Sequence, residues 1–299
     1  MRPETIEEIV GQTQAKEVVK TLINSSKALN EQVPHILFSG ASGTGKTSFA
    51  RIISKEIGGT LFAVNGCSIR NYKQALNVID GMSDKDVLFI DEIHSLPKRI
   101  SEYLYTIMED YCYFDDNGQE VKTPKITIIG ASTEIGQLPI PLKRRFKFIA
   151  EFVRYTLDEL TEVCYLVCKK RGFKLNKNIA EAIAKTCKGN PSKMVNRTEW
   201  VYSYMKGNNI TSVNIAKLLE IIALQGVNAD GLETKDIEYL KTLQKHSPAS
   251  INSLSSKLGV DPITIKNDIE PYLSSIGLFK ITKKGRELTR DGINYVKNL

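Results

Sequence analysis

The chain has 299 residues, of which 41% are hydrophobic and 25% are charged, as in an ordinary water-soluble protein of two or three domains. It contains no run of about 18 apolar residues, which excludes a membrane-spanning helix, and its polar N-terminus lacks a secretory signal. The five cysteines form no CxxC pair, which argues against a disulfide framework or a zinc site, so we expect a cytoplasmic protein.

The net charge of +7 is unevenly distributed along the chain. Residues 1–140 include fourteen basic and eighteen acidic residues, a balance of −4, whereas residues 141–210 include fifteen and six, a balance of +9. The basic excess begins at PLKRRFKF, residues 141–148. This asymmetry indicates a polyanionic partner, although a solvated basic face would have the same composition.

The first half of the chain alternates short apolar runs with helical patterns. Residues 5–30 predict a helix, and a loop followed by a helix is expected within residues 40–58. Further helices are predicted at 75–82 and 101–111. The predicted strands are HILFSG (35–40), LFAVN (61–65), DVLFID (86–91) and KITIIGAST (125–133). Strands that alternate with helices predict an α/β fold with a parallel sheet.

The strand patterns stop after about residue 154, and amphipathic helical segments follow. Further helical segments run to about residue 276, and GLFKITKKGRELT (277–289) alternates like a two-stranded hairpin with a Lys-Gly turn. Helices followed by a β hairpin are the outline of a winged helix. We therefore predict a P-loop domain at 1–153, a helical lid at 154–226 and a winged-helix domain at 227–299.

One motif predicts a nucleotide site. GASGTGKT, from Gly40 to Thr47, fits the P-loop pattern in full, with a predicted strand before it and a helix after it. Its glycines allow backbone N–H groups to surround phosphates, while Lys46 would neutralise them and the Thr47 hydroxyl would hold Mg²⁺. The expected ligands are ATP and Mg²⁺. The residues that we expect to hold the nucleotide here are Gly40, Ser42, Gly43, Thr44, Gly45, Lys46, Thr47 and Ser48.

A pair of carboxylates ends the third predicted strand. In VLFIDEIH, Asp91 would hold Mg²⁺ together with Thr47, and Glu92 would orient and deprotonate the attacking water. Two helix-capping acids are the alternative interpretation. The presence of both carboxylates, about 45 residues after a P-loop, favours ATP hydrolysis over binding alone.

Two further stretches are ambiguous by themselves. TIIGAST ends a strand with Ser132 and Thr133, which would reach the γ-phosphate or the attacking water, or would simply end the strand. PLKRRFKF places Arg144 and Arg145 before Phe146. These arginines fit a solvated surface, a nucleic acid, or the nucleotide of a neighbouring subunit, where an arginine supplies transition-state charge.

These motifs, in this order, resemble AAA+ ATPases and in detail the RuvB family, bacterial motors that drive branch migration of Holliday junctions. The likeness covers nearly the whole chain, including RPETIEEIVGQ, DVLFIDEIHSL, TIIGASTEIGQLPIPLKRRF and GLETKDIEYLKTL. The tail TIKNDIEPYLSSIGLFKITKKGRELT discriminates most, since most AAA+ relatives lack this winged helix. The resemblance implies a homo-oligomeric ring, expected to be a hexamer, that pulls duplex or four-way-junction DNA during recombination and repair.

The resemblance also implies roles for individual residues. Thr133 matches the first sensor, and Arg145 matches an arginine finger that acts on the neighbouring subunit. The adenine base would be contacted by Arg2, Pro3, Ile9, Val10 and Tyr155. In the wing, Lys283, Lys284 and Arg286 match the basic turn that contacts DNA phosphates.

Two departures from the family pattern are visible. The family has an arginine after a Gly-Thr-Pro run in the lid, whereas here GNPSKMVNR places Ser192 after the proline, and Lys193 aligns only if one residue is inserted. Lysine would keep the charge but lose the two-pronged contact of arginine. The hairpin on which RuvA docks in the family is here YCYFDDNGQEVKTPK, shorter and acidic, which argues against a RuvA-like partner and for a divergent, mobile-element version.

Three functions remain open at this point. The first is an ATP-driven DNA motor of the branch-migration type, with Glu92, Thr133, Arg145 and Lys193 in catalysis. The second is an AAA+ replication helicase or clamp loader, which uses the same ATPase for loading. The third is a non-catalytic ATP-dependent scaffold on DNA, against which the intact P-loop and carboxylate pair both argue.

Overall fold

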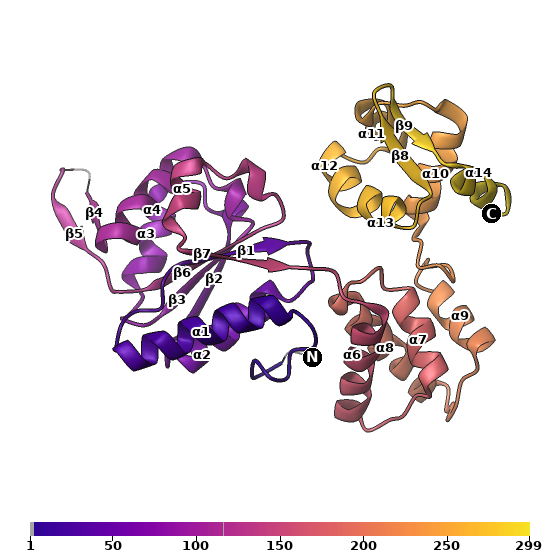
Figure 1. Cartoon of the computed structure of the whole chain (residues 1–299), viewed down its shortest axis with the longest axis horizontal. Helices are drawn as coiled ribbons and strands as arrows, with labels where there is room; N and C mark the ends of the chain where they lie inside the picture. Colours follow the sequence, from indigo (N-terminus) through magenta and orange to yellow (C-terminus); the bar gives the residue numbers. More distant parts are fainter. Residues whose placement is uncertain (1–2, 116) are drawn as a thin grey trace. The chain divides into compact units, whose positions relative to one another are not determined.

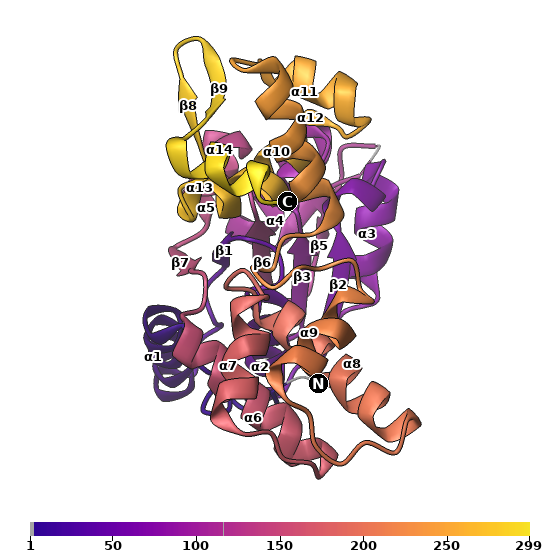
Figure 2. The ribbon, with the colours of Figure 1, turned by 90° about the vertical axis from the view of Figure 1, so that its right-hand side faces the viewer.

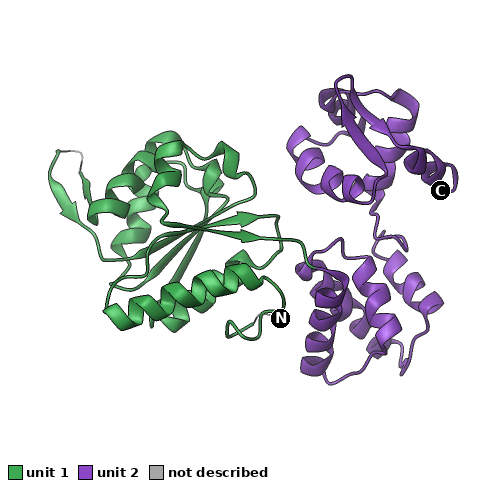
Figure 3. Ribbon diagram, in the orientation of Figure 1, with its two compact units in different colours: residues 1–155 green, residues 156–299 purple. Residues whose placement is uncertain are grey.

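A computed structural model of the chain describes residues 3–115 and 117–299. These residues form two compact units, 1–155 and 156–299, which are coloured separately in Figure 3. The predicted fold class is confirmed: a parallel α/β unit comes first, and a helical segment and a winged helix follow in the second unit.

The first unit is built on a five-stranded parallel sheet in the order β2-β3-β6-β1-β7 (Figure 1). Its strands are β1 (Ile36–Gly40), β2 (Leu61–Asn65), β3 (Val87–Asp91), β6 (Thr127–Ser132) and β7 (Phe148–Phe152). The four predicted strands are all present, and β7 is an additional strand that the sequence analysis missed. It pairs only with β1 at the edge of the sheet, so Phe148 and Ile149 stay exposed and it lacks a buried-strand pattern.

Helices cover both faces of this sheet (Figure 1). They are α1 (Thr13–Leu29), α2 (Lys46–Glu56), α3 (Tyr72–Asp80), α4 (Lys98–Asp110) and α5 (Ile140–Arg145), with short 3-10 turns η1 (Gly66–Ser68), η2 (Ile93–Ser95) and η3 (Ile135–Gln137). The first helix begins later than predicted, because Gly11 and Gln12 adopt left-handed backbone angles with φ of 63° and 53°. A separate hairpin is formed by β4 (Cys112–Phe114) and β5 (Glu120–Lys122).

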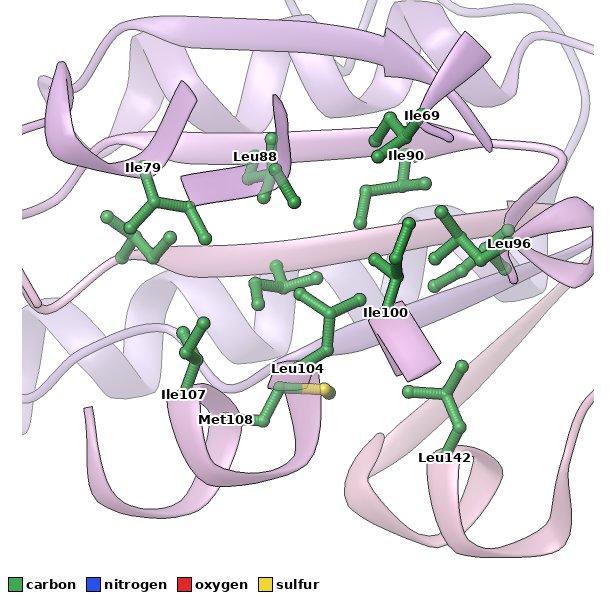
Figure 4. Packing of buried hydrophobic residues seen from close by; sticks show 14 of the residues in the cluster. Ile69, Ile79, Leu88, Ile90, Leu96, Ile100, Leu104, Ile107, Met108 and Leu142 are labelled. Carbon is green, nitrogen blue, oxygen red and sulfur yellow. The ribbon is translucent and has the colours of Figure 1, made fainter. Parts of the chain in front are cut away.

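The core alternates between the two faces of the sheet. Ile36 and Phe38 of β1 pack on the face covered by α1 and α2, whereas Leu37 packs on the face covered by α3 and α4. Figure 4 shows the second face, where Leu88 and Ile90 of β3 meet apolar side chains of α3 and α4. Burying each of these large aliphatic side chains contributes about 1.5–3 kcal/mol.

This topology brings the chemically important chain segments to one edge. Because the strands are parallel, β1, β3 and β6 all end at the same side of the sheet. The register pairs Ser39 with Ser132, and Asn65 with Asp91. The P-loop, the carboxylate pair and the Ser132–Thr133 stretch therefore leave the sheet side by side.

The second unit is mainly helical. Its first helices are α6 (Leu157–Arg171), α7 (Lys177–Lys185), α8 (Pro191–Gly207) and α9 (Ile215–Ala223). The winged helix contains α10 (Thr234–His246), α11 (Ile251–Leu258), α12 (Pro262–Thr264), a π-helical turn η4 (Ile265–Ile269), α13 (Glu270–Ser275) and α14 (Arg290–Lys297). The hairpin of β8 (Phe279–Thr282) and β9 (Gly285–Leu288) lies between α13 and α14 in sequence and is drawn in yellow in Figure 2.

Candidate functional site

The P-loop joins the end of β1 to the start of α2. Gly40 has φ of 150°, and a β-carbon there would lie 2.3 Å from the carbonyl oxygen of Phe152, so only glycine fits. Gly43 and Gly45 also have positive φ, at 76° and 110°. The Thr44 hydroxyl donates to the Ala41 carbonyl over 2.8 Å, which closes the loop on itself.

Lys46 stands at the first position of α2 and points back into the loop. Its ammonium donates to the carbonyl oxygens of Gly40 and Ala41 over 2.7 and 2.9 Å. Burial lowers the pKa of Lys46, and the negative charges of Glu92 and Asp91 partly oppose that shift. A buried ammonium that two neutral carbonyls hold, and that pairs directly with no carboxylate of the described residues, fits the phosphate of a nucleotide.

Asp91 and Glu92 follow β3 at the same edge. Burial, and then the charge of Glu92, raise the pKa of Asp91, while Lys46 opposes the shift. Glu92 has a left-handed backbone with φ of 47°, which is uncommon for a residue with a side chain. Burial and the adjacent Glu92 charge both make the ionised form of Asp91 costly, and a divalent cation held by Asp91 and Thr47 would offset that cost.

The carboxylate of Glu92 is held from two sides. Its Oε2 accepts hydrogen bonds from the Thr133 hydroxyl over 2.9 Å and from the Thr133 backbone N–H over 3.2 Å. Nδ1 of His94 lies 3.3 Å from the same oxygen and 3.0 Å from the Ser132 hydroxyl. Thr133 was predicted at this site, but His94 was missed, although it stands two residues after Glu92 in the DEIH sequence.

The N-terminal segment and the end of the unit meet near the P-loop. Ile9 and Val10 are buried, and a β-carbon at Gly45 would lie 3.9 Å from the Tyr155 hydroxyl. The side-chain amide of Gln12 exchanges two hydrogen bonds with the backbone of Val153, at 2.8 and 3.1 Å. These contacts place Tyr155 beside the loop and join Gln12 to the end of the unit. Pro3 is partly exposed, and the prediction for Arg2 lies outside the described residues.

Comparisons with known proteins agree with this geometry. The family model described as "Holliday junction DNA helicase RuvB P-loop domain" matches residues 1–152, and "RuvB C-terminal winged helix domain" matches residues 229–297. The chain belongs to the RuvB family. The resemblance seen in the sequence is therefore confirmed, and with it a nucleotide-binding P-loop domain.

Individual relatives extend the likeness to the whole chain. A protein of Pseudothermotoga lettingae named "Holliday junction branch migration complex subunit RuvB" is 32% identical, over 99% of this chain and 88% of its own. The protein of the same name from Campylobacter hominis is 33% identical, over 97% and 88%. The solved Thermotoga maritima RuvB Holliday junction branch migration motor superposes with a TM-score of 0.90 and 29% identity, over 99% of this chain and 98% of the other.

Arg145, the RuvB-type arginine finger of the sequence analysis, is held by α4. Its guanidinium pairs with Glu109 over 2.9 Å, donates to the carbonyls of Tyr105 and Pro141 over 3.3 and 3.0 Å, and lies 4.4 Å from the Tyr105 ring centroid. No contact of the described residues joins it to the nucleotide site of its own unit. Arg145 lines a groove of about 1010 Å³ together with Arg144, α1 and β7 residues, and no P-loop residue lines that groove.

The lid position that departs from the RuvB pattern lies in the second unit. Asn190 caps α8 by accepting the backbone N–H groups of Ser192 and Lys193. The ammonium of Lys193 pairs with Glu233, which caps α10 of the winged helix. Arg197 is buried, lies 3.6 Å from the same carboxylate, and has one nitrogen without a hydrogen-bond partner. Lys193 is therefore part of a charged cluster between α8 and α10.

The three basic residues predicted at the wing differ in their environment. Lys283 and Lys284 form the turn between β8 and β9 and are exposed, whereas the Lys-Gly turn was expected one residue later. Arg286 is 16% exposed and pairs with Glu270 over 2.8 Å. Glu270 also accepts a hydrogen bond from the hydroxyl of buried Tyr239 over 2.9 Å. The guanidinium of Arg286 thus joins the wing to the core.

The remaining findings concern membrane spans, the hairpin and two cysteines. Within residues 3–115 and 117–299, no helix is long and apolar enough to cross a bilayer. The hairpin where the family pattern departs has three residues in each strand, and Phe114 at its end is 50% exposed. Cys164 and Cys168, on α6, are both buried.

Proposed function

We propose that this chain is the ATP-hydrolysing subunit of a ring-shaped DNA motor that drives branch migration of four-way junctions in recombination and repair. Support comes from its membership of the RuvB family and from the names of its relatives. The observation that carries the proposal is the hydrogen-bonded pair of Glu92 and Thr133 beside Lys46 and Asp91, because together they form a hydrolytic set at one edge of the sheet.

The residues of this edge would share the chemistry of ATP hydrolysis. The Lys46 ammonium would exchange its two loop carbonyls for phosphate oxygens. Thr47 and Asp91 would hold Mg²⁺, which would supply positive charge against the phosphates. Glu92 orients a water molecule toward the γ-phosphorus and takes its proton as the new P–O bond forms and the bond to the ADP oxygen breaks. Thr133 holds Glu92 in place. The base would lie against Pro3, Ile9, Val10 and Tyr155.

Arg145 would complete the site of a neighbouring subunit. Since α4 holds this arginine away from the P-loop of its own unit, its charge serves catalysis only across a subunit boundary, as in a homo-oligomeric ring, expected to be a hexamer. Loss of such an arginine lowers kcat by about 10³-fold or more. The role of Lys193 near the γ-phosphate would require that it leave Glu233.

The winged helix would supply the grip on DNA. Lys283 and Lys284 stand exposed at the hairpin turn, where they can neutralise phosphates of any sequence. Arg286 would remain paired with Glu270 and would not contact the phosphates. A RuvA-like partner would dock poorly here, because the β4–β5 hairpin has only three residues in each strand.

The test is ATP hydrolysis with and without duplex and four-way-junction DNA, for the wild type, Arg145→Ala and Glu92→Gln. We expect stimulation by DNA. Turnover should fall by about 10³-fold or more in Arg145→Ala and by about 10²-fold or more in Glu92→Gln, with ATP binding retained in both. Mixing the two variants should restore part of the activity, because each supplies what the other lacks. A hydrolysis rate that neither DNA nor Arg145→Ala changes would refute the proposal of a DNA motor.

A further inference from the structure

Two segments at the carboxyl edge of the sheet contain basic residues without any acidic ones. Residues 66–79, after β2, contain Arg70 and Lys73, and residues 95–101, after β3, contain Lys98 and Arg99. Neither segment contains Asp or Glu, although residues 1–140 as a whole carry a balance of −4. Asp80 and Glu102 directly follow the two segments, so the positive charge is concentrated within the segments themselves.

Both segments are fixed to the core next to their basic residues. Ile69 precedes Arg70, Ile100 follows Arg99, and both isoleucines are buried in the same apolar cluster (Figure 4). The turn η1 contacts η2, and α3 contacts α4. The backbone that carries the four cations is thus held by packed side chains rather than by a free loop.

Two stacked aromatic rings join α3 of the first segment to α4, which begins in the second. The rings of Tyr72 and Tyr103 are stacked, with centroids 4.9 Å apart and planes inclined by 7°. The guanidinium carbon of Arg99 lies 5.7 Å from the Tyr72 centroid, and the Lys73 nitrogen lies 5.9 Å from the same centroid. We call Arg70, Tyr72, Lys73, Lys98, Arg99 and Tyr103 the basic–aromatic patch.

Other lysines of the unit have acidic partners on the surface, as in the pairs of Lys20 with Glu7 and of Lys27 with Glu56. For the basic groups of Arg70, Lys98 and Arg99, no described carboxylate lies within the 4.0 Å of an ion pair. All three residues are exposed. Neighbouring cations that no described carboxylate pairs with repel one another, and a polyanion would relieve that repulsion.

We propose that the basic–aromatic patch is a second DNA-binding surface, which contacts the phosphate backbone of duplex DNA from the ATPase unit itself. The inference rests on the proposed function in that DNA is the polyanion that this motor handles. The ring of Tyr72 restricts the Arg99 side chain before DNA arrives, so that less conformational entropy is lost on binding. Contacts of this kind do not depend on sequence, as a translocating protein requires.

The test compares DNA binding by full-length variants over a range of salt concentrations, with a non-hydrolysable ATP analogue and a mixed-sequence duplex of about 40 base pairs. Arg70→Gln/Arg99→Gln removes two phosphate contacts, so the magnitude of the slope of log K against log[salt] should fall by about 2. The affinity for DNA at about 0.1 M salt should fall by roughly tenfold or more. Each single variant should lower the slope by about 1. The matched control is Lys122→Gln/Lys125→Gln, which removes two exposed charges elsewhere in the same unit and should leave the slope unchanged.

The wing variant Lys283→Gln/Lys284→Gln separates this inference from the proposed function. If it weakens binding while the patch variants bind with the wild-type slope, the patch proposal is refuted and the DNA motor stands. If neither weakens binding, DNA contact by the wing fails as well. Arg99→Lys should retain the slope, since it keeps the phosphate charge. Patch variants that alter only ring assembly, measured by sedimentation, would assign the surface to protein contacts and overturn the proposal.

Discussion

Lowering the pH below 6.5 should destabilise the P-loop unit, because buried His35 cannot accept a proton in the folded state. Nδ1 of His35 accepts the backbone N–H of Ile128 over 2.9 Å, so this nitrogen has no proton. Nε2 lies 3.1 Å from the carbonyl oxygen of Met108 and is therefore the donor. Protonation of Nδ1 would point its N–H at the N–H of Ile128, so this hydrogen bond would be lost at a residue that is only 7% exposed.

The expected size of the effect follows from the shift in pKa. Burial lowers the pKa of His35 from 6.5 to about 4, and the charge of Lys147 acts in the same direction. Between these values the unfolded chain binds a proton that the folded chain does not, so stability is lost as the pH falls through 6.5 toward 4. Linkage gives a loss of about 2 kcal/mol between pH 7 and pH 5 from this residue.

Urea unfolding at pH 7 and pH 5 measures this loss, and comparison with His35→Gln isolates it. Glutamine offers a donor and an acceptor but does not titrate, so this variant should lack about 2 kcal/mol of the pH dependence, whatever its stability at pH 7. The control is His246→Gln, since His246 is exposed and its removal should leave the wild-type pH dependence. A wild type and His35→Gln with the same pH dependence would refute the reasoning, as would a ring-carbon NMR titration of His35 near 6.5.

Three further predictions concern ion pairs and the catalytic edge. Lys188→Met leaves the buried carboxylate of Asp236 without its ion-pair partner. It should lower the free energy of unfolding of the second unit by about 3 kcal/mol in urea titrations. Lys177→Met removes one partner of an exposed pair and should change this free energy little. Equal shifts in these two variants would contradict the argument. Thr133→Val removes the hydroxyl bonded to the carboxylate of Glu92, the proposed general base. It should lower kcat by about tenfold or more while the Kd for ATP stays unchanged, as single-turnover kinetics would show. Glu109→Gln removes the charge that holds Arg145 and should lower kcat of the assembled ring, with Glu109→Asp restoring part of it; an unchanged kcat would mean that the arginine needs no support from α4.

Strong local signals in the sequence predicted the nucleotide-binding motif at the carboxyl edge of the sheet. Gly40 to Thr47 require glycine at positive φ and lysine at a helix start, and both requirements are met in the structure. The apolar strand that ends at Asp91 was equally clear. Because parallel strands end at one edge, these motifs together also predicted that Lys46, Asp91 and Thr133 would be close to one another.

The misses have a common physical origin. The edge strand β7 is half exposed and pairs only with β1, so its residues do not show the continuous burial that identifies a strand. The late start of α1 depends on left-handed backbone angles at Gly11 and Gln12, which apolar spacing does not report. The C-terminal helix α14 is short and was not predicted either.

The sequence by itself determined the fold class, the winged helix and the nucleotide-binding motif, because each depends on residue types at fixed short spacings. The tertiary structure decided which charges are paired. Arg145 with Glu109, Lys193 with Glu233 and Arg286 with Glu270 join residues 16 to 40 positions apart. Whether a cation is exposed or bound to a carboxylate depends on how helices and strands pack, and no local pattern reports it.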